Sequence, residues 1–272
     1  MVGIVIAFKK FDYRAGIFGS PWVGFDNFKF LFIGGDIFKV ARNTVLYNIG
    51  FIIINNTVEI TIAIILTELS GKYFKRVAQS VMFLPYFISW VVVGAFVYNL
   101  FNYEFGFMNT MLKSLNINAI NIYDKPIAWV LIILVFSLWK GLGYGIVLYL
   151  AAITGIDREM YEAAEIDGAN IFKRIRFITL PSLIPTIVIL ILLSIGNVFR
   201  GDFSMFYQIV GDNSMVYGAT DVIDTYVIRS MTTVREFGMT SAAGFVQSIL
   251  CFLIINIANG IVKKVDKDYA LF

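Results

Sequence analysis

The sequence predicts an all-α, polytopic membrane protein, and three observations support this class: composition, the length of the apolar runs and their continuity. Hydrophobic residues make up 58% of the 272 residues and charged residues 15%, against about 45–50% and about 25% in soluble domains. Five runs reach the roughly 20 helical residues that cross a bilayer. The runs are continuous rather than alternating, which favours helices over β-barrel strands. We therefore expect five full transmembrane helices and the remnant of a first one.

The first element is a short apolar stretch, residues 1–8, which precedes Lys9 and Lys10. It is too short for the apolar core of a signal peptide, and no basic region precedes it. We interpret it as the end of a first span, so we expect the numbered chain to begin inside that helix. The five full spans follow in order, at about residues 43–67, 77–101, 127–153, 177–199 and 240–262.

Two of the spans carry residues that disturb helices. Pro85, in the second span, removes a backbone donor, and we expect a kink there. Residues 140–145 (KGLGYG) bring three glycines into the third span, and we expect them to loosen that helix. Such irregularities are tolerated in a membrane where neighbouring helices satisfy the freed backbone groups.

Basic residues in the loops orient the spans. The loop after the first full span and the C-terminal tail are both basic, and the number of spans between them puts them on the same side. Because cytoplasmic loops are rich in Lys and Arg, we place both in the cytoplasm, together with the loop between the third and fourth spans. Residues 9–42, with six basic and three acidic residues, then lie outside. The basic residues of the two cytoplasmic segments are Lys72, Lys75, Arg76, Lys263, Lys264 and Lys267.

Scarce residue types exclude several classes of site. The chain has no histidine and one cysteine, Cys251, which excludes histidine-dependent catalytic triads and an intrachain disulfide and argues against a metal site. It has no GxxxxGK[ST] sequence, so it does not bind ATP through a phosphate loop of its own. The net charge of +3 is too small for a nucleic-acid surface. We expect no enzyme activity, no metal and no cofactor on this chain.

The cytoplasmic loop at about residues 157–176 concentrates charge between two apolar runs. Asp157 is placed to cap a short helix, and Gly168 is placed to end it. A basic segment, residues 173–176, then leads to Pro181 at the start of the fourth span. A helix of about ten residues is marginal alone. It is therefore either held by other parts of the chain or by a partner, or it is a solvated connector.

The same loop carries a spaced motif. Glu162-Ala163-Ala164 is followed by Gly168 and then by Ile178-x-Leu180-Pro181. This pattern resembles the EAA motif of inner-membrane permease subunits of binding-protein-dependent ABC importers. Stretches at residues 83–89, 139–157, 166–169 and 221–229 resemble the sugar-transporter branch of that family, especially its LplB-like polysaccharide and oligosaccharide permeases. The resemblance covers nearly the whole chain.

The resemblance implies a function and a set of partners. It implies a single transmembrane permease domain over residues 1–272, which moves an oligosaccharide or polysaccharide fragment across the inner or cytoplasmic membrane of a bacterial cell. The implied partners are a homologous second permease, an extracellular or periplasmic substrate-binding protein, membrane lipid and a separate ATPase dimer that binds ATP and Mg. In this family the EAA helix sits in a cleft of the ATPase and converts its closure into movement of the membrane helices.

The coupling residues are carried over by position from the EAA motif and its surroundings. We expect Glu162 to meet a basic or polar group of the ATPase, Ala163 and Ala164 to allow close packing, and Gly168 to make the turn. Lys173 and Arg174 are expected to contact either the ATPase or lipid headgroups. The expected ATPase-coupling residues are Glu162, Ala163, Ala164, Asp167, Gly168, Lys173 and Arg174.

Two charged residues lie deep in spans, where charge is costly and indicates function. Glu59 and Lys140 lie at depths that differ by roughly 6 Å, and we expect them to pair or to share a polar network; the alternative is that each only fixes helix packing. Aromatic and amide side chains hold sugars, and Lys140 and Arg200 suit an acidic saccharide, although aromatics in a membrane protein more often face lipid or other helices. The expected path residues are Glu59, Tyr98, Asn99, Trp139, Lys140, Tyr144, Asn197, Arg200 and Gln247.

The outer segment, residues 201–238, is expected to contain an amphipathic helix around residues 222–231. In the family such surfaces dock the binding protein, and a re-entrant or interfacial helix is the alternative. The rival function is a self-contained secondary transporter, coupled to an ion gradient through Glu59 and Lys140. It would need internal repeats, and we see none between the two halves of the sequence.

Overall fold

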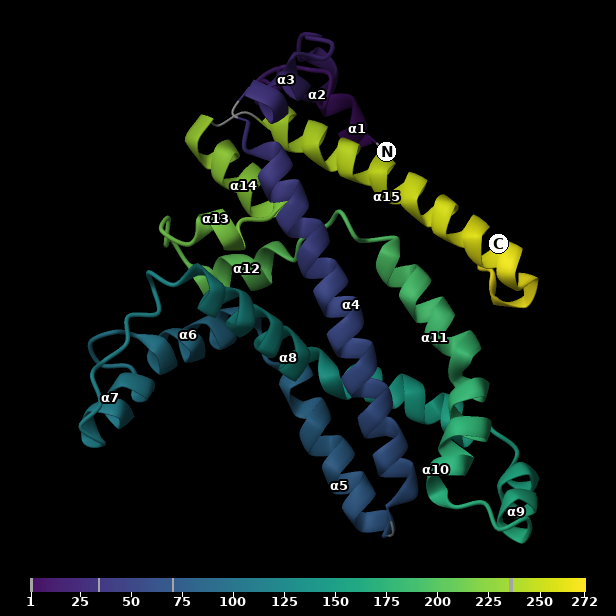
Figure 1. Ribbon diagram of the computed structural model, residues 1–272. Coiled ribbons are helices and arrows are strands. Elements are labelled where there is room, and N and C mark those ends of the chain that lie inside the picture. The colour runs from purple at the N-terminus through teal and green to yellow at the C-terminus, as the bar shows by residue number, and fades with distance from the viewer. Residues whose placement is uncertain (1, 34, 70, 235–236) are drawn as a thin grey trace. The chain divides into compact units, whose positions relative to one another are not determined.

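The computed structural model of the chain describes residues 2–33, 35–69, 71–234 and 237–272, and every regular element within them is helical. The one β contact of the described residues is an isolated bridge between Lys9 and Trp22. The elements shown in Figure 1 are α1 (Val2–Ile6), α2 (Gly16–Gly19), α3 (Asp26–Ile33), α4 (Ile37–Glu68), α5 (Lys72–Phe83), η1 (Leu84–Phe87), α6 (Trp90–Phe101), α7 (Phe107–Ser114), α8 (Pro126–Thr154), α9 (Arg158–Ile166), α10 (Ile171–Arg174), η2 (Ile175–Thr179), α11 (Leu180–Ile195), α12 (Phe203–Val210), α13 (Tyr217–Thr220), α14 (Ile223–Val234), α15 (Phe237–Val265) and η3 (Lys267–Tyr269).

Four helices of the described chain are long and apolar enough to cross a membrane. They are α4, α8, α15 and the continuous helix Ile171–Ile195, which α10, η2 and α11 form together. The middle part of that helix, η2, is π-helical and so holds an extra residue in its turn. These helices contain most of the first, third, fourth and fifth predicted spans, and the all-α membrane class is confirmed.

The second predicted span, residues 77–101, is not one straight helix. The segment Lys72–Phe87 and α6 are bent by 95° at a short break. Pro85 lies in the 3-10 helix η1, where its ring and missing N–H interrupt the α-helical hydrogen bonds. Ser89 then starts α6 as a cap, since its side chain accepts a hydrogen bond from the Val92 N–H at 3.4 Å. The kink expected at Pro85 is thus a full break. The residues that the structure describes contain four helices long and apolar enough to cross a membrane, or five spans if the bent pair is one span.

α8 is continuous, so the expectation that residues 140–145 loosen the third span is wrong. Two of the glycines lie where other chain segments come close. A Cβ on Gly143 would lie 2.6 Å from the backbone nitrogen of Phe83, and a Cβ on Gly145 would overlap the carboxylate of Glu59. These glycines therefore allow close packing, and neighbouring segments hold the helix intact.

The chain divides into two compact units, each with a core of its own. Unit 1 consists of Met1–Ile49, Ser89–Ile133 and Gly196–Ile254, and unit 2 of Gly50–Ile88, Leu134–Ile195 and Ile255–Phe272. Unit 1 therefore holds the predicted outer segment and unit 2 the predicted cytoplasmic loop. The buried core of unit 2 joins α4, α8 and α11 through Ala63, Ile64, Leu66, Ile146, Tyr149, Ile153 and Leu183. That of unit 1 joins α4, α14 and α15 through Val40, Ile223, Val227 and Ala243.

The N-terminal apolar stretch forms α1, a helix of five residues, and leads into a compact loop. Lys9 is buried there, and its Nζ donates to the carbonyls of Ile17 at 3.0 Å and Phe18 at 2.9 Å. Asn27 Nδ2 donates to the carbonyls of Ala7 and Lys9, each at 2.9 Å. Because a buried ammonium needs such acceptors, Lys9 organises this loop rather than only ending an apolar run.

Candidate functional site

α9 is the helix of the predicted EAA loop, and Asp157 sets its start. The Asp157 carboxylate accepts a hydrogen bond from the Glu159 N–H at 3.0 Å, and Glu159 adds a second negative charge in the first turn. Both groups stabilise a helix N-terminus, where the backbone N–H groups lack partners and the dipole is positive. The predicted cap at Asp157 is confirmed.

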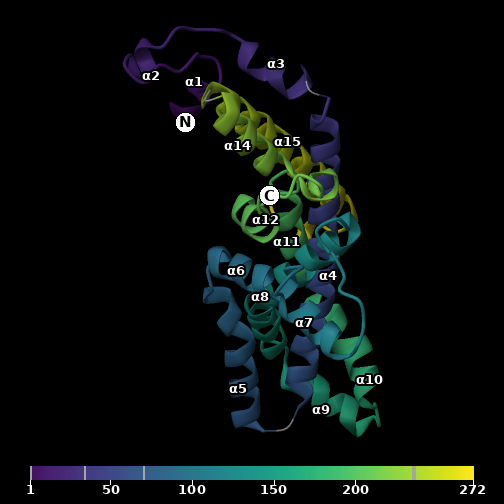
Figure 2. The same ribbon diagram turned by 90° about the vertical axis from the view of Figure 1, so that its left-hand side faces the viewer.

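α9 ends in a turn that depends on Gly168. Gly168 has a φ of +70°, a conformation that costs a residue with a side chain about 1–2 kcal/mol. The Gly168 N–H donates to Glu165 O at 3.0 Å, and the Ala169 N–H donates to Ala164 O at 2.8 Å. These are the two bonds of a Schellman motif, so the predicted stop at Gly168 is confirmed. In both ribbon views the chain then continues into α10, which lies beside α9 (Figures 1 and 2).

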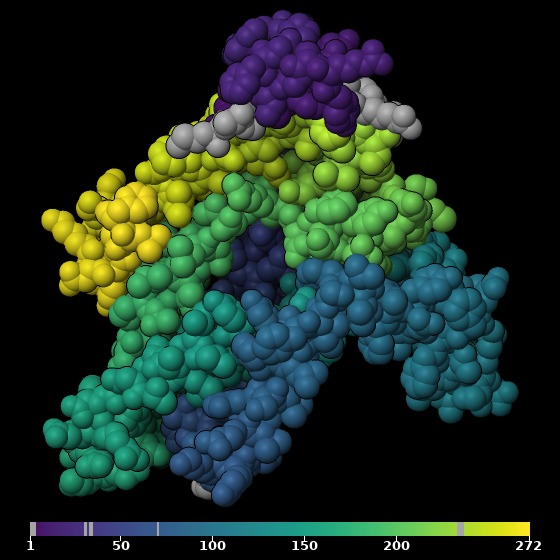
Figure 3. All heavy atoms as spheres, turned by 180° about the vertical axis from the view of Figure 1, so that it is seen from behind, coloured from purple at the N-terminus to yellow at the C-terminus, as the bar shows by residue number. Residues whose placement is uncertain are grey.

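The surface of α9 is open. None of its residues is buried, and Glu162, Ala163 and the following Asp167 are exposed, while Ala164 is half-buried. Ile166 is 87% exposed and Phe172 of α10 is 77% exposed. In the space-filling view this segment, in teal to green, lies at the surface (Figure 3). The loop thus exposes two large apolar side chains together with acidic ones, and a partner can reach all of them.

Arg174 lies against this chain's own acids. Its side chain is 17% exposed and forms ion pairs with Glu165 of α9 and, at 3.6 Å, with Glu68, the last residue of α4. Two carboxylates of the same unit thus lie next to the guanidinium, and its contact with an ATPase or with lipid headgroups stays a prediction. Lys173 is exposed, and its contact with an ATPase or with lipid headgroups stays a prediction.

Lys140 and Tyr144 lie four residues apart on α8, and both contact Tyr86 of η1. Lys140 Nζ donates to the Tyr86 carbonyl at 2.7 Å and lies 5.5 Å from the centre of its ring. The Tyr144 ring stacks on the Tyr86 ring with centroids 5.3 Å apart. Both tyrosines are nevertheless half-exposed, and aromatic rings beside a cation suit a sugar ring with an acidic group. Tyr86 was not among the predicted residues, and Pro85, which breaks the helix at this point, is the signal that could have identified it.

Glu59 lies on another side of α8 from Lys140. Its carboxylate occupies the space next to Gly145, and Gly145 is five residues from Lys140, which is about 140° around a helix. The contacts that the structure describes for Glu59 and Lys140 do not include a direct pair between them. A pair or a shared polar network of Glu59 and Lys140 stays a prediction, since similar depth alone does not bring two residues to the same side of a helix.

The remaining path residues have contacts of their own. Trp139 packs edge-on against Phe136, with ring centroids 6.0 Å apart. In unit 1, Tyr98 is 50% exposed and lines a cavity, and Asn99 donates to the carbonyl of Ala95 on its own helix at 2.8 Å. Of the predicted path residues, the structure thus brings Lys140 and Tyr144 together. Both contact Tyr86, which was not predicted.

Asn197 and Arg200 lie beyond the end of α11, which stops at Ile195 rather than at residue 199. The Arg200 N–H donates to the Asn197 carbonyl at 2.8 Å, so the two residues belong to one turn. The Arg200 guanidinium lies 3.4 Å from the Ser248 hydroxyl. Both residues are therefore in the connection between α11 and α12, not inside a span.

Gln247 is buried and joins three segments of unit 1. Its Nε2 donates to Phe199 O at 2.9 Å and to Asp224 Oδ2 at 3.0 Å, and the same Oδ2 accepts from the Gly201 N–H at 2.6 Å. Gln247 of α15 is thus held against α14 and the connection after α11. This position favours a structural role for Gln247 over direct contact with a substrate.

Burial raises the pKa of the Asp224 carboxyl above its ordinary value of 3.8, although hydrogen bonds from Gly201 and Gln247 act in the opposite direction. The folded chain therefore binds this proton more tightly than the unfolded chain, and the free energy of unfolding falls as the pH rises from about 4 through the raised pKa. The fold thus favours the protonated form, and the ionised carboxylate makes the folded chain less stable at neutral pH.

Asp224→Asn is expected to remove this part of the pH dependence and to raise the unfolding temperature near neutral pH. The amide oxygen can accept both hydrogen bonds without a charge to bury. Unfolding temperatures of the detergent-solubilised protein, recorded across the acid-to-neutral range, measure the effect, with the exposed Asp124→Asn as the control. A stability profile of Asp224→Asn that still follows the wild type would contradict this assignment.

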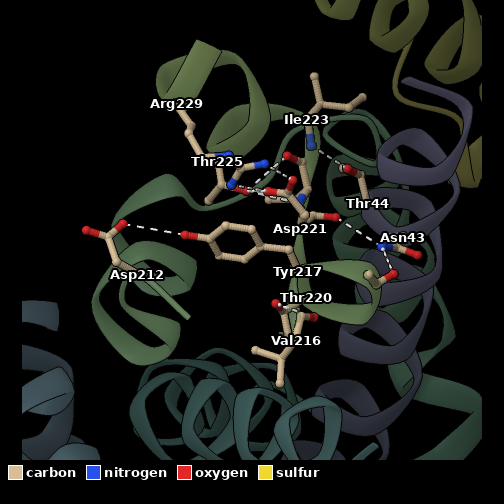
Figure 4. Close-up of polar contacts among 12 residues, drawn as sticks. Asn43, Thr44, Asp212, Val216, Tyr217, Thr220, Asp221, Ile223, Thr225 and Arg229 are labelled. Carbon is tan, nitrogen blue, oxygen red and sulfur yellow. Dashed lines mark hydrogen bonds and ion pairs between the residues drawn. The ribbon is translucent and has the colours of Figure 1, made fainter. Parts of the chain in front are cut away.

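A second polar cluster in unit 1 is centred on Asp221, which is buried. Arg229 binds both oxygens of its carboxylate, and Thr225 donates to one of them at 2.6 Å. The Tyr217 ring lies 4.2 Å from the Arg229 guanidinium, and Asn43 of α4 donates to the Asp221 carbonyl at 3.1 Å (Figure 4). These contacts fix the start of α14 on α4. The predicted amphipathic helix of the outer segment is confirmed as α14.

A cavity of about 350 Å³ lies between α12, α13 and α14 beside this cluster. Phe203 and Tyr207 stack along one wall with centroids 5.1 Å apart, and the Tyr217 hydroxyl lies 3.4 Å from the Asp212 carboxylate on another. The guanidinium of Arg229 also lines the cavity, but Asp221 already neutralises its charge. The outer segment therefore presents a shaped surface rather than a plain amphipathic helix.

Comparisons with known proteins agree with this architecture. Residues 59–267 match the family described as "Binding-protein-dependent transport system inner membrane component". Protein LplB of Bacillus subtilis (strain 168) is 33% identical over 268 residues, which cover 98% of this chain and 84% of the relative. The polygalacturonan/rhamnogalacturonan transport system permease protein YteP of the same organism is 30% identical over 268 residues, covering 98% and 83%.

Two solved structures are also similar. One is a bacterial ABC transporter involved in the import of the acidic polysaccharide alginate, which matches with a TM-score of 0.86 and 27% identity over 98% of this chain and 89% of that chain. The other is a bacterial alginate ABC transporter in complex with an alginate pentasaccharide-bound periplasmic protein. It matches with a TM-score of 0.82 and 27% identity over 90% of this chain and 84% of that chain.

Proposed function

Because this chain belongs to the family of binding-protein-dependent transport system inner membrane components, we propose that it is the permease subunit of an ABC importer for an oligosaccharide or polysaccharide fragment. The observation that carries this proposal is the loop around α9. A capped helix holds Glu162 and Ala163 on an uncovered surface, and Gly168 ends it at the position that the EAA motif requires. A solvated connector would not need exposed Ile166 and Phe172 beside it.

The proposed partners follow from the same loop and from the relatives. A separate ATPase dimer, which binds ATP and Mg, covers α9, and a homologous second permease completes the pathway with this chain as a single permease domain over residues 1–272. The outer segment with α14 docks a substrate-binding protein, as supported by the similar alginate transporter with its periplasmic protein. The membrane is the bacterial inner or cytoplasmic membrane. ATP hydrolysis takes place on the partner, and this chain catalyses no reaction.

The proposed substrate is an acidic saccharide. The similar transporters carry alginate, which is described as acidic, or are named for polygalacturonan and rhamnogalacturonan. In this chain, Lys140 beside the stacked rings of Tyr86 and Tyr144 supplies a cation and aromatic faces. A cation that binds a carboxylate and a ring face that stacks on a sugar are the two contacts that such a substrate needs.

Reconstitution of the complex in liposomes tests this function. The chain is co-expressed with a second permease and an ATPase from neighbouring genes and supplied with the corresponding binding protein and oligogalacturonate or alginate oligosaccharide. ATP hydrolysis is expected to rise several-fold when the binding protein and the oligosaccharide are both present, and labelled oligosaccharide is expected to accumulate inside. Uptake by this chain alone, driven by a proton or sodium gradient, would overturn the proposal in favour of a secondary transporter.

Lys140→Ala is expected to lower the uptake of an acidic oligosaccharide by roughly tenfold or more, since a hydrogen bond to a charged group contributes about 1.5–3 kcal/mol. Uptake rates at saturating ATP measure the effect. Lys113→Ala, which removes an exposed lysine of α7, is the matched control and is expected to transport normally. A folded Lys140→Ala protein with unchanged uptake would remove Lys140 from the path.

A further inference from the structure

The attachment of α9 to the rest of unit 2 is unusual for a helix that has to carry force. No residue of α9 is buried, so apolar packing does not fix its position. Two side-chain contacts join α9 to the helix after it in the described part of the chain: the Tyr161 and Thr179 hydroxyls lie 2.9 Å apart, and Glu165 pairs with Arg174. Both contacts are polar, and both come from one side of α9.

Tyr161 and Glu165 are four residues apart and therefore lie on one face of α9. The exposed Glu162 and Ala163 lie on another face, together with Ile166. α9 thus has an attached face and an open face. A partner can cover the open face without disturbing the contacts that hold the helix.

Arg174 links the attached face of α9 to the membrane helices. Its guanidinium reaches Glu165 on α9 and Glu68 at the end of α4, the latter at 3.6 Å. Arg174 itself belongs to the continuous helix Ile171–Ile195, so a displacement of α9 acts directly on that helix. Through Glu68 the same displacement also acts on α4, a second spanning helix.

The chemistry of arginine fits this position. A guanidinium has several N–H donors in a fixed plane and can bind two carboxylates at once, whereas a lysine ammonium is a point charge without such a fork. Exposed ion pairs contribute little to stability, and Glu165 is 62% exposed on its side chain. The pair with Glu165 therefore adds little to stability by itself, and its main effect is to fix the position of α9.

We propose that Arg174 is a positioning residue that ties α9 to two spanning helices, α4 and Ile171–Ile195, so that movement imposed on α9 by the ATPase reaches both. This inference rests on the proposed function, because it assumes that α9 receives the ATPase. It adds a specific route of transmission through Glu165, Arg174 and Glu68. Without these ion pairs, α9 would move with the ATPase but would transmit little of that movement to the two spanning helices.

The measured quantity is the number of oligosaccharide molecules taken up per ATP hydrolysed by the reconstituted complex. For Arg174→Gln the ATPase is expected to co-purify as in the wild type, because the open face of α9 is unchanged, and the ratio is expected to fall at least fivefold. Arg174→Lys is expected to restore part of the ratio. Arg176→Gln, which removes an exposed arginine two residues later, is the control and is expected to keep the wild-type ratio.

The outcomes separate this inference from the proposed function. A wild-type complex that neither hydrolyses ATP in response to the binding protein nor transports contradicts the proposed function itself. A wild-type complex that couples normally, with an Arg174→Gln complex of equal ratio, overturns the role of Arg174 alone. If the complex with Arg174→Gln does not assemble, the Glu68→Gln variant is measured in its place. Glu68→Gln removes the ion pair with Arg174 but leaves the pair between Arg174 and Glu165 intact. A wild-type ratio in Glu68→Gln would then overturn the route to α4.

Discussion

Replacing Glu162 by lysine is expected to reduce ATP-driven uptake by a factor of ten or more while the membrane helices stay inserted. Glu162 is exposed on the open face of α9, and its side chain supports none of the contacts that hold the helix. The substitution changes two units of charge at a surface that we propose is covered by the ATPase. Truncating one partner of a close charged pair in an interface costs about 2–5 kcal/mol, so reversal should weaken the complex strongly.

The amount of ATPase that co-purifies with the permease, and the uptake of labelled oligosaccharide, measure this effect. Glu104→Lys provides the matched control, because Glu104 is also exposed but lies in the turn between α6 and α7 of unit 1. That variant is expected to bind the ATPase and to transport as the wild type does. If Glu162→Lys bound the ATPase and transported normally, the assignment of α9 as the coupling helix would fail.

The second large effect is expected at Gly143, where alanine alone should prevent the correct folding of much of the protein. A Cβ at this position would lie 2.6 Å from the backbone nitrogen of Phe83 and would also meet other backbone atoms of residues 82 and 83. Backbone cannot rotate away as a side chain can, so α8 and the end of α5 would have to separate. Overpacking of this kind costs about 1–3 kcal/mol and sometimes more.

Gly141→Ala is the matched control on the same helix. Nothing lies within 4 Å of a Cβ at Gly141, and alanine is favoured over glycine inside a helix by about 1 kcal/mol. Gly141→Ala is therefore expected to raise the unfolding temperature slightly, whereas Gly143→Ala lowers both that temperature and the yield of monodisperse protein in size-exclusion chromatography. Equal behaviour of the two variants would show that α8 and α5 do not pack as described.

Local chemistry in the sequence predicted α9 well. An aspartate before a helical stretch and a glycine after it act through bonds to their immediate neighbours, and both Asp157 and Gly168 act as predicted. The long apolar runs predicted the four continuous spans for a similar reason, since a helix that crosses the membrane needs only sufficient length and apolar side chains. The family resemblance then supplied the role of the loop, which composition alone left open.

The features that the sequence did not predict depend on contacts between distant segments. Apolarity is the same in a straight span and in one that breaks, so the run at 77–101 did not show that Ile88 and Ser89 turn the chain. Depth along two helices can be counted from the sequence, but their rotation cannot, so the sequence did not show that Glu59 lies next to Gly145 and Lys140 next to Tyr86. Glu68 as the partner of Arg174 could not be predicted either, because no local pattern links the two residues.

The π-helical segment Ile175–Thr179 makes the number of residues before α11 as important as their identity. A π turn holds one residue more than an α turn, and loss of that residue would rewind the segment as α-helix. Because the π turn absorbs its extra residue locally, Arg174 would then still face nearly the same side relative to α11. An insertion or deletion that the segment did not absorb in this way would turn Arg174 by about 100° relative to α11. It would therefore break the ion pairs of Arg174 with Glu165 and Glu68.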